Sequence, residues 1–139
     1  MGARFWISVV VMFVLALLMG FVVHGMLLHS DYAALPNLLR TETDAQGYFG
    51  WMILAHALMG FGYTWIYVKG RDPAKPPVSQ GLRFGAALAV AFLIPNYLIY
   101  YAVQPWPMAV VVKQIAFDTI GLLILGVVVA LINQGPAKA

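Results

Sequence analysis

Four long apolar stretches, divided by short segments rich in proline and polar residues, constrain this sequence more than any other feature. An α-helix rises about 1.5 Å per residue, so about 20 apolar residues are needed to cross the hydrocarbon core of a bilayer. We place the four stretches at residues 5–28, 48–68, 82–103 and 108–132. The sequence therefore predicts an all-α polytopic membrane protein, with four transmembrane helices in a single domain over residues 1–139.

The composition supports a membrane protein and excludes several function classes. Hydrophobic residues make up 63% of the chain and charged residues 9%, against roughly 25% charged in an ordinary soluble domain. The chain has no cysteine, which excludes disulfides, thiolate metal sites and cysteine nucleophiles. It also has no Walker loop, dinucleotide fingerprint, serine triad or H-E-x-x-H motif. We therefore predict no catalytic residue, no metal site and no nucleic-acid partner, and an enzyme is not favoured.

Helix-breaking residues lie between the stretches and predict how they are connected. The segment GRDPAKPPVSQG (70–81) holds three prolines, and QPWP (104–107) is typical of a tight turn. These breaks predict two helical hairpins. In the loop at 31–47, Thr43 and Gln46 have the spacing of a capping box, so we expect short helical pieces there, at the membrane interface.

Lysine and arginine concentrate on one side of the predicted bundle, and such residues favour the cytoplasmic side of a membrane. That side carries Arg4, Lys69, Arg71, Lys75, Arg83 and Lys138. The other side carries Arg40 and, just inside the fourth helix, Lys113. We therefore expect both termini in the cytoplasm and the 30–47 loop outside. Lys113 is expected to reach the headgroups or to pair with Glu42 or Asp44.

Polar side chains inside the predicted helices gather in the outer half of the membrane. The set comprises His24, His56, Asn96, Tyr100, Gln114 and Asp118. At 1.5 Å per residue, His24 lies roughly 7 Å below the outer surface and Asp118 roughly 15 Å. Because polar groups that face lipid cost several kcal/mol, we expect their helix faces to turn toward one another, with Asp118 meeting a histidine, most simply His56.

These residues have both a structural and a functional interpretation. A membrane histidine is more often an interhelical hydrogen-bonding residue than a ligand to a cofactor. An acid near the middle of the membrane is rare enough to be a functional hypothesis by default. A neutral Asp118 bonded to His56, Thr119 or Asn96 would instead lock the bundle. Both interpretations of Asp118 stay open at this point.

Three function classes fit the pattern. The first is an accessory or scaffold subunit of a larger membrane complex, favoured by the small size and by small-residue packing faces such as Gly81-x-x-x-Gly85. The second is a small homo-oligomeric transporter or channel that uses Asp118 and His56. The third is a membrane binder of a quinone, a lipid or haem. Haem between His24 and His56 is the weakest variant, because their depths differ by roughly 4 Å.

Several blocks of the sequence carry a family resemblance. They are GFVVHGMLL (20–28), YFGWMILAHALMG (48–60), GLRFG (81–85), PNYLIYYAVQP (95–105) and VVKQIAFDTIGLLILG (111–126). With these blocks the chain resembles small bacterial inner-membrane proteins grouped as a family of unknown function. The resemblance implies a four-helix protein of the bacterial inner membrane, with no assigned activity and no catalytic residues to transfer.

Overall fold

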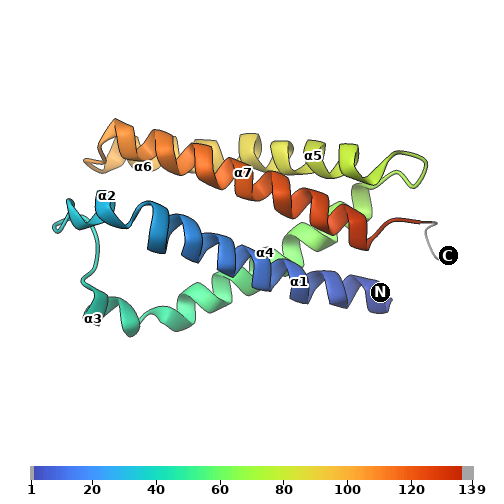
Figure 1. The fold of residues 1–139 in the computed structure, drawn as a ribbon, viewed down its shortest axis with the longest axis horizontal. Helices are drawn as coiled ribbons and strands as arrows, with labels where there is room; N and C mark the ends of the chain where they lie inside the picture. The colour runs from blue at the N-terminus through green and yellow to red at the C-terminus, as the bar shows by residue number, and fades with distance from the viewer. Residues whose placement is uncertain (1, 136–139) are drawn as a thin grey trace.

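Four helices long and apolar enough to cross a membrane run through residues 2–135, which the computed structural model describes (Figure 1). The first is α1 (Ala3–Gly20) continued by a π-helical segment, η1 (Phe21–Leu27); the second is α4 (Phe49–Gly70); the third is α5 (Pro77–Leu88), η2 (Ala89–Leu93) and α6 (Ile94–Val103); the fourth is α7 (Met108–Ile132). The described residues contain no strand. The prediction of an all-helical chain with four membrane-length helices is confirmed, whereas Lys138 lies outside the described residues.

Some helix boundaries differ from those expected. The third helix begins at Pro77, five residues earlier than predicted, because proline is well tolerated in the first turn of a helix. The loop at 31–47 does contain two short helices, α2 (His29–Ala33) and α3 (Glu42–Gln46). The cap of α3 is Thr41, whose side chain accepts a 3.3 Å hydrogen bond from the backbone N–H of Asp44. The prediction that Thr43 would be the capping residue was wrong.

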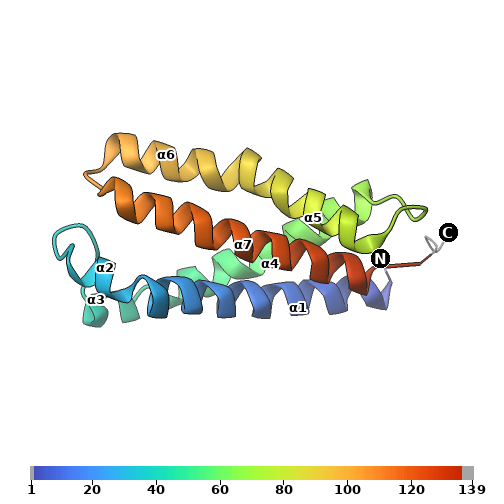
Figure 2. The same cartoon turned by 45° about the horizontal axis from the view of Figure 1, so that its top comes forward.

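The helices pack chiefly as two pairs, α1 with α4 and α5 with α7, and contacts between α1 and α7 join the pairs (Figure 2). Glycines allow the closest approaches. A Cβ atom on Gly60 would lie 2.8 Å from the backbone of Phe13 on α1, and one on Gly81 would lie 2.6 Å from Cα of Val127 on α7. Backbones this close leave no room for a side chain, so these contacts depend on glycine.

The two ends of the bundle differ in packing. We call the end where α1 begins and α7 ends the terminal end, and the end that carries α2 and α3 the distal end (Figure 1). The largest buried apolar cluster comprises Met12, Ala16, Tyr67, Leu88, Ala89, Leu122, Leu125, Val129 and Ala130. It fills the bundle between Asp118 and the terminal end. Toward the distal end α4 separates from α1 (Figure 1), so the distal half is packed more openly.

The π-helical segment η2 changes which residues of the third helix face the bundle. A π-turn holds more residues than an α-turn, so every residue beyond it is rotated relative to a regular helix. Gly85 and Ala89 are buried, as the α-helical spacing predicts. Beyond η2, Asn96 and Tyr100 are exposed, and Tyr97 turns inward instead. The expectation that the helix face carrying Asn96 and Tyr100 turns toward the other helices was therefore wrong.

Candidate functional site

Asp118 lies about ten residues inside α7 and is held by side chains from two other helices. The hydroxyl of Tyr97, on α6, donates a 2.5 Å hydrogen bond to Oδ2 of Asp118. Nε2 of His24, on η1, lies 3.4 Å from the same oxygen. The Asp118 side chain is only 17% exposed. A carboxylate with so little access to water is stabilised mainly by these two partners.

A chain of hydrogen bonds leads from His24 toward the distal end. Nδ1 of His24 lies 2.6 Å from the hydroxyl oxygen of Tyr32, on α2, and the two rings are stacked. The same hydroxyl oxygen accepts a 3.0 Å hydrogen bond from Nε2 of Gln114. The order Gln114, Tyr32, His24, Asp118 therefore links the start of α7 to its middle through η1 and α2.

The donors and acceptors along this chain are mutually consistent. Because the Tyr32 oxygen accepts from Gln114, its single proton is free to be donated to Nδ1 of His24, which leaves Nε2–H directed at Asp118. The hydrogen bonds of the chain therefore assign the His24 tautomer that carries its proton on Nε2.

Tyr32 stays a neutral phenol at ordinary pH. Burial raises its pKa above 10.0, the nearby Asp118 and Asp31 carboxylates raise it further, and the hydrogen bond from Gln114 opposes the shift. The hydroxyl therefore keeps the proton that the chain requires.

An ion pair closes the distal side of this chain. Nζ of Lys113, on α7, donates hydrogen bonds of 2.8 and 2.9 Å to the two carboxylate oxygens of Asp31, on α2. Trp106 also packs edge-on against Tyr32. These contacts fix α2 over the start of α7 and so position Tyr32. From the sequence we expected Lys113 to reach the headgroups or to pair with Glu42 or Asp44. It pairs instead with Asp31, because α2 lies over the start of α7.

A cavity of about 180 Å³ adjoins the chain. Its lining consists of Tyr97, Tyr100, Gln104, Trp106, Val111 and Gln114. Three of the six lining side chains are aromatic, and two side-chain amides supply donors and acceptors. Because Tyr97 and Gln114 belong both to the cavity and to the hydrogen-bonded chain, a molecule in the cavity would lie directly beside the polar site.

The structure brings three of the six predicted site residues together, namely His24, Gln114 and Asp118. Tyr100 lines the cavity and is 44% exposed, and Asn96 is exposed and does not line the cavity. His56 is also apart from Asp118. Its Nδ1 lies 2.7 Å from the carbonyl oxygen of Met52, and its Nε2 faces Gly20. The histidine that meets Asp118 is therefore His24, whereas His56 packs against α1 at Gly20.

Two residues of the site were not predicted. Tyr97 was missed because η2 rotates it inward, and Pro95, whose missing N–H disturbs helical hydrogen bonding, is the local sequence feature that could have indicated this. Tyr32 was missed because it lies on α2, beyond the predicted first helix. No spacing rule relates a residue in a loop helix to a residue on α7.

The described residues do not favour haem. Both ring nitrogens of His24 are directed at other side chains, Tyr32 and Asp118, so neither is presented to an iron. Residues 2–135 hold no cluster of three or more His, Cys, Asp or Glu side chains that could bind a metal ion. The site is instead a set of hydroxyl, imidazole, amide and carboxyl groups suited to hydrogen bonding and proton exchange.

Comparisons with known protein families, with characterised proteins and with solved structures found no match to this chain. The resemblance to bacterial inner-membrane proteins of unknown function therefore stays a prediction.

Proposed function

We propose that this chain is a multi-pass protein of the bacterial inner membrane that binds a lipid-soluble ligand with a quinone-like head group, and exchanges a proton with it near Asp118 and His24. In this proposal the helices form two hairpins, both termini are cytoplasmic, and the distal end faces outward. The observation that carries the proposal is the sharing of Tyr97 and Gln114 between the cavity and the hydrogen-bonded chain.

The chemistry of the site supports a quinone-like ligand. A quinone carbonyl accepts hydrogen bonds from amide or phenol donors, and the reduced form donates hydroxyl protons to a carboxylate or an imidazole. Gln114 and Gln104 supply amide donors at the cavity wall, and Asp118 with His24 supplies the proton acceptor behind it. The aromatic rings of Tyr97 and Trp106 offer the flat apolar surfaces that such a ring stacks on.

The packing of the terminal half supports a binding protein over a channel. The hydrogen-bonded chain ends at Asp118, and the buried apolar cluster, with Met12 and Val129 fully buried, fills most of the bundle beyond it. The buried polar side chains on that side, such as Ser8 and Thr64, have no hydrogen bond to Asp118 among the described residues. An ion crossing the chain would have to open this core. Within residues 2–135, the hydrogen-bonded route from Asp118 leads toward the distal end, through His24 and Tyr32.

Quinone binding in lipid nanodiscs tests the proposal, with fluorescence quenching of Trp106 as the readout in a variant whose other three tryptophans are phenylalanine. Loss of one hydrogen bond to the ligand costs about 1.4 kcal/mol, a tenfold weaker Kd. We expect this loss for Gln114→Leu. The matched control is Asn96→Leu, because Asn96 is an exposed polar residue of the third helix that does not line the cavity. Equal affinity of Gln114→Leu and the parent would contradict the proposal.

An accessory subunit of a larger membrane complex is the second candidate. It is supported by the separation of α4 from α1 at the distal end, which leaves large side chains such as Trp51 and Leu58 exposed on a helix with few neighbours (Figure 1). Purification from native membranes tests it. Partners at fixed stoichiometry would favour the accessory subunit, and purification alone or as a homo-oligomer would favour the binding protein.

A further inference from the structure

We propose that a second site, at the terminal end of the bundle, binds the phosphate of an anionic phospholipid headgroup. The site is a hollow of about 320 Å³ between the loop that joins α4 to α5 and the end of α7. Its wall includes the polar side chains of Arg71, Asp72, Lys75, Gln80 and Asn133 and the aromatic ring of Tyr67. This inference does not depend on the ligand proposed for Asp118.

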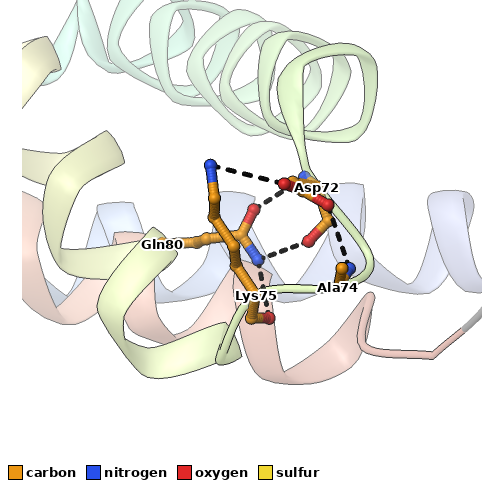
Figure 3. Close-up of polar contacts among 4 residues, drawn as sticks. All are labelled: Asp72, Ala74, Lys75 and Gln80. Carbon is orange, nitrogen blue, oxygen red and sulfur yellow. Dashed lines mark hydrogen bonds and ion pairs between the residues drawn. The ribbon is translucent and has the colours of Figure 1, made fainter.

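The loop that forms one wall is held in place by Gln80 (Figure 3). Its Nε2 donates to the carbonyl oxygens of Asp72 and Lys75, at 2.8 and 3.0 Å, and its Oε1 accepts from the backbone N–H of Asp72 at 2.7 Å. The Asp72 carboxylate in turn accepts from the backbone N–H of Ala74 at 3.0 Å and lies 3.3 Å from Nζ of Lys75. The hollow is therefore formed in advance of any ligand.

Arg71 crosses from this loop to the end of α7. Its Nη1 donates to the carbonyl oxygen of Asn133 and, at 2.9 Å, to that of Gly135. Within the part of the chain that the structure describes, these two bonds occupy a single guanidinium nitrogen. A fixed guanidinium with further N–H groups available is the geometry that binds phosphate oxygens well.

Depth and charge both favour a lipid headgroup. The hollow begins where α4 ends, at Gly70, and where α7 ends, at Ile132, and both are helices long and apolar enough to cross a membrane. Among the described residues, five basic side chains belong to this end, Arg4, Lys69, Arg71, Lys75 and Arg83, against one acid, Asp72. Basic pockets between transmembrane helices at this level are typical sites for anionic headgroups.

The test adds phosphatidylglycerol, phosphatidylcholine or inorganic phosphate to the detergent-purified protein. Native mass spectrometry measures the bound lipid, and the thermal unfolding midpoint measures the stabilisation. We expect phosphatidylglycerol to remain bound in preference to phosphatidylcholine. Removing one basic contact should weaken phosphatidylglycerol binding about fivefold. Lys75→Gln tests this without disturbing the helix contacts, because the Lys75 side chain is exposed, and Arg71→Gln tests the fixed guanidinium.

Lys69→Gln is the matched control, since Lys69 carries the same charge at the same end but does not line the hollow. It should bind phosphatidylglycerol as the parent does. An equal loss in Lys69→Gln would show a diffuse charge effect and overturn the site. Absence of any preference for phosphatidylglycerol would overturn it too. Stabilisation by inorganic phosphate as large as that by phosphatidylglycerol would overturn the assignment to a lipid and point to a soluble phosphate compound.

Discussion

The hydrogen bond from Tyr97 to Asp118 gives a prediction whose size depends on the charge of the acid. Interhelical hydrogen bonds between neutral groups in membranes are worth about 0.6 kcal/mol on average. A hydrogen bond to an ionised group is worth about 1.5–3 kcal/mol. The 2.5 Å distance between the Tyr97 hydroxyl oxygen and Oδ2 of Asp118 lies in the range of charge-assisted hydrogen bonds. We therefore expect a coupling free energy of about 1.5–3 kcal/mol between Tyr97 and Asp118.

A double-mutant cycle measures this coupling. The variants are Tyr97→Phe, Asp118→Ala and both together, and the free energy of unfolding is measured in mixed micelles. The cycle cancels the cost of the cavity that Asp118→Ala leaves, because the cavity is present on both sides of the comparison. Tyr100→Phe in place of Tyr97→Phe is the control and should couple by less than about 0.5 kcal/mol. A Tyr97 coupling no larger than the Tyr100 coupling would refute the geometry of the site.

Three further predictions concern packing, pH and topology. Gly126→Ala should lower the thermal unfolding midpoint, because its Cβ would lie 3.0 Å or less from the α5 backbone and disrupt the contact of α5 with α7. Gly62→Ala is the control and should leave the midpoint unchanged, because a Cβ there has no neighbour within 4 Å. The backbone N–H of Ala74 and the Lys75 ammonium lower the pKa of Asp72 below 3.8. The stability that this carboxylate gives the loop is therefore present above pH 3.8 and is lost as the pH falls through the lowered pKa. An NMR titration of the loop should show that loss, and Asp72→Asn should abolish it. A reporter fused after Ala139 should be active in the cytoplasm and one inserted near Thr41 outside; the reverse would invert the proposed orientation.

The hydrophobic pattern was sufficient to predict the four helices, because the length and apolarity of a membrane helix are local properties of the sequence. The stretch at 108–132 coincides with α7. Gln114 and Asp118, whose face was predicted to turn toward the other helices, are buried or nearly so on α7. A regular helix with no interruption preserves its spacing from end to end. Predictions along it are therefore reliable.

The composition of the site was predicted only in part, because two irregularities break the regular spacing. The η2 segment exchanges Asn96 and Tyr100 for Tyr97 on the inward face. The crossing of α4 with α1 places His56 against Gly20, so it is His24 that lies beside Asp118. Helical spacing gives the faces of each helix separately, whereas the crossing geometry of two helices depends on contacts such as the one at Gly60.

The most direct test of the central proposal is infrared difference spectroscopy of the protein in nanodiscs, with and without a reduced short-chain quinone. If the ligand exchanges a proton or a hydrogen bond with Asp118, its binding should shift a carboxyl band, and that shift should be absent in Asp118→Asn. Replacement of His24 by Gln, which keeps a polar side chain without a titrating ring, should alter the same band. Identical difference spectra for the parent and Asp118→Asn would contradict the proposal that Asp118 and His24 form the site of proton exchange.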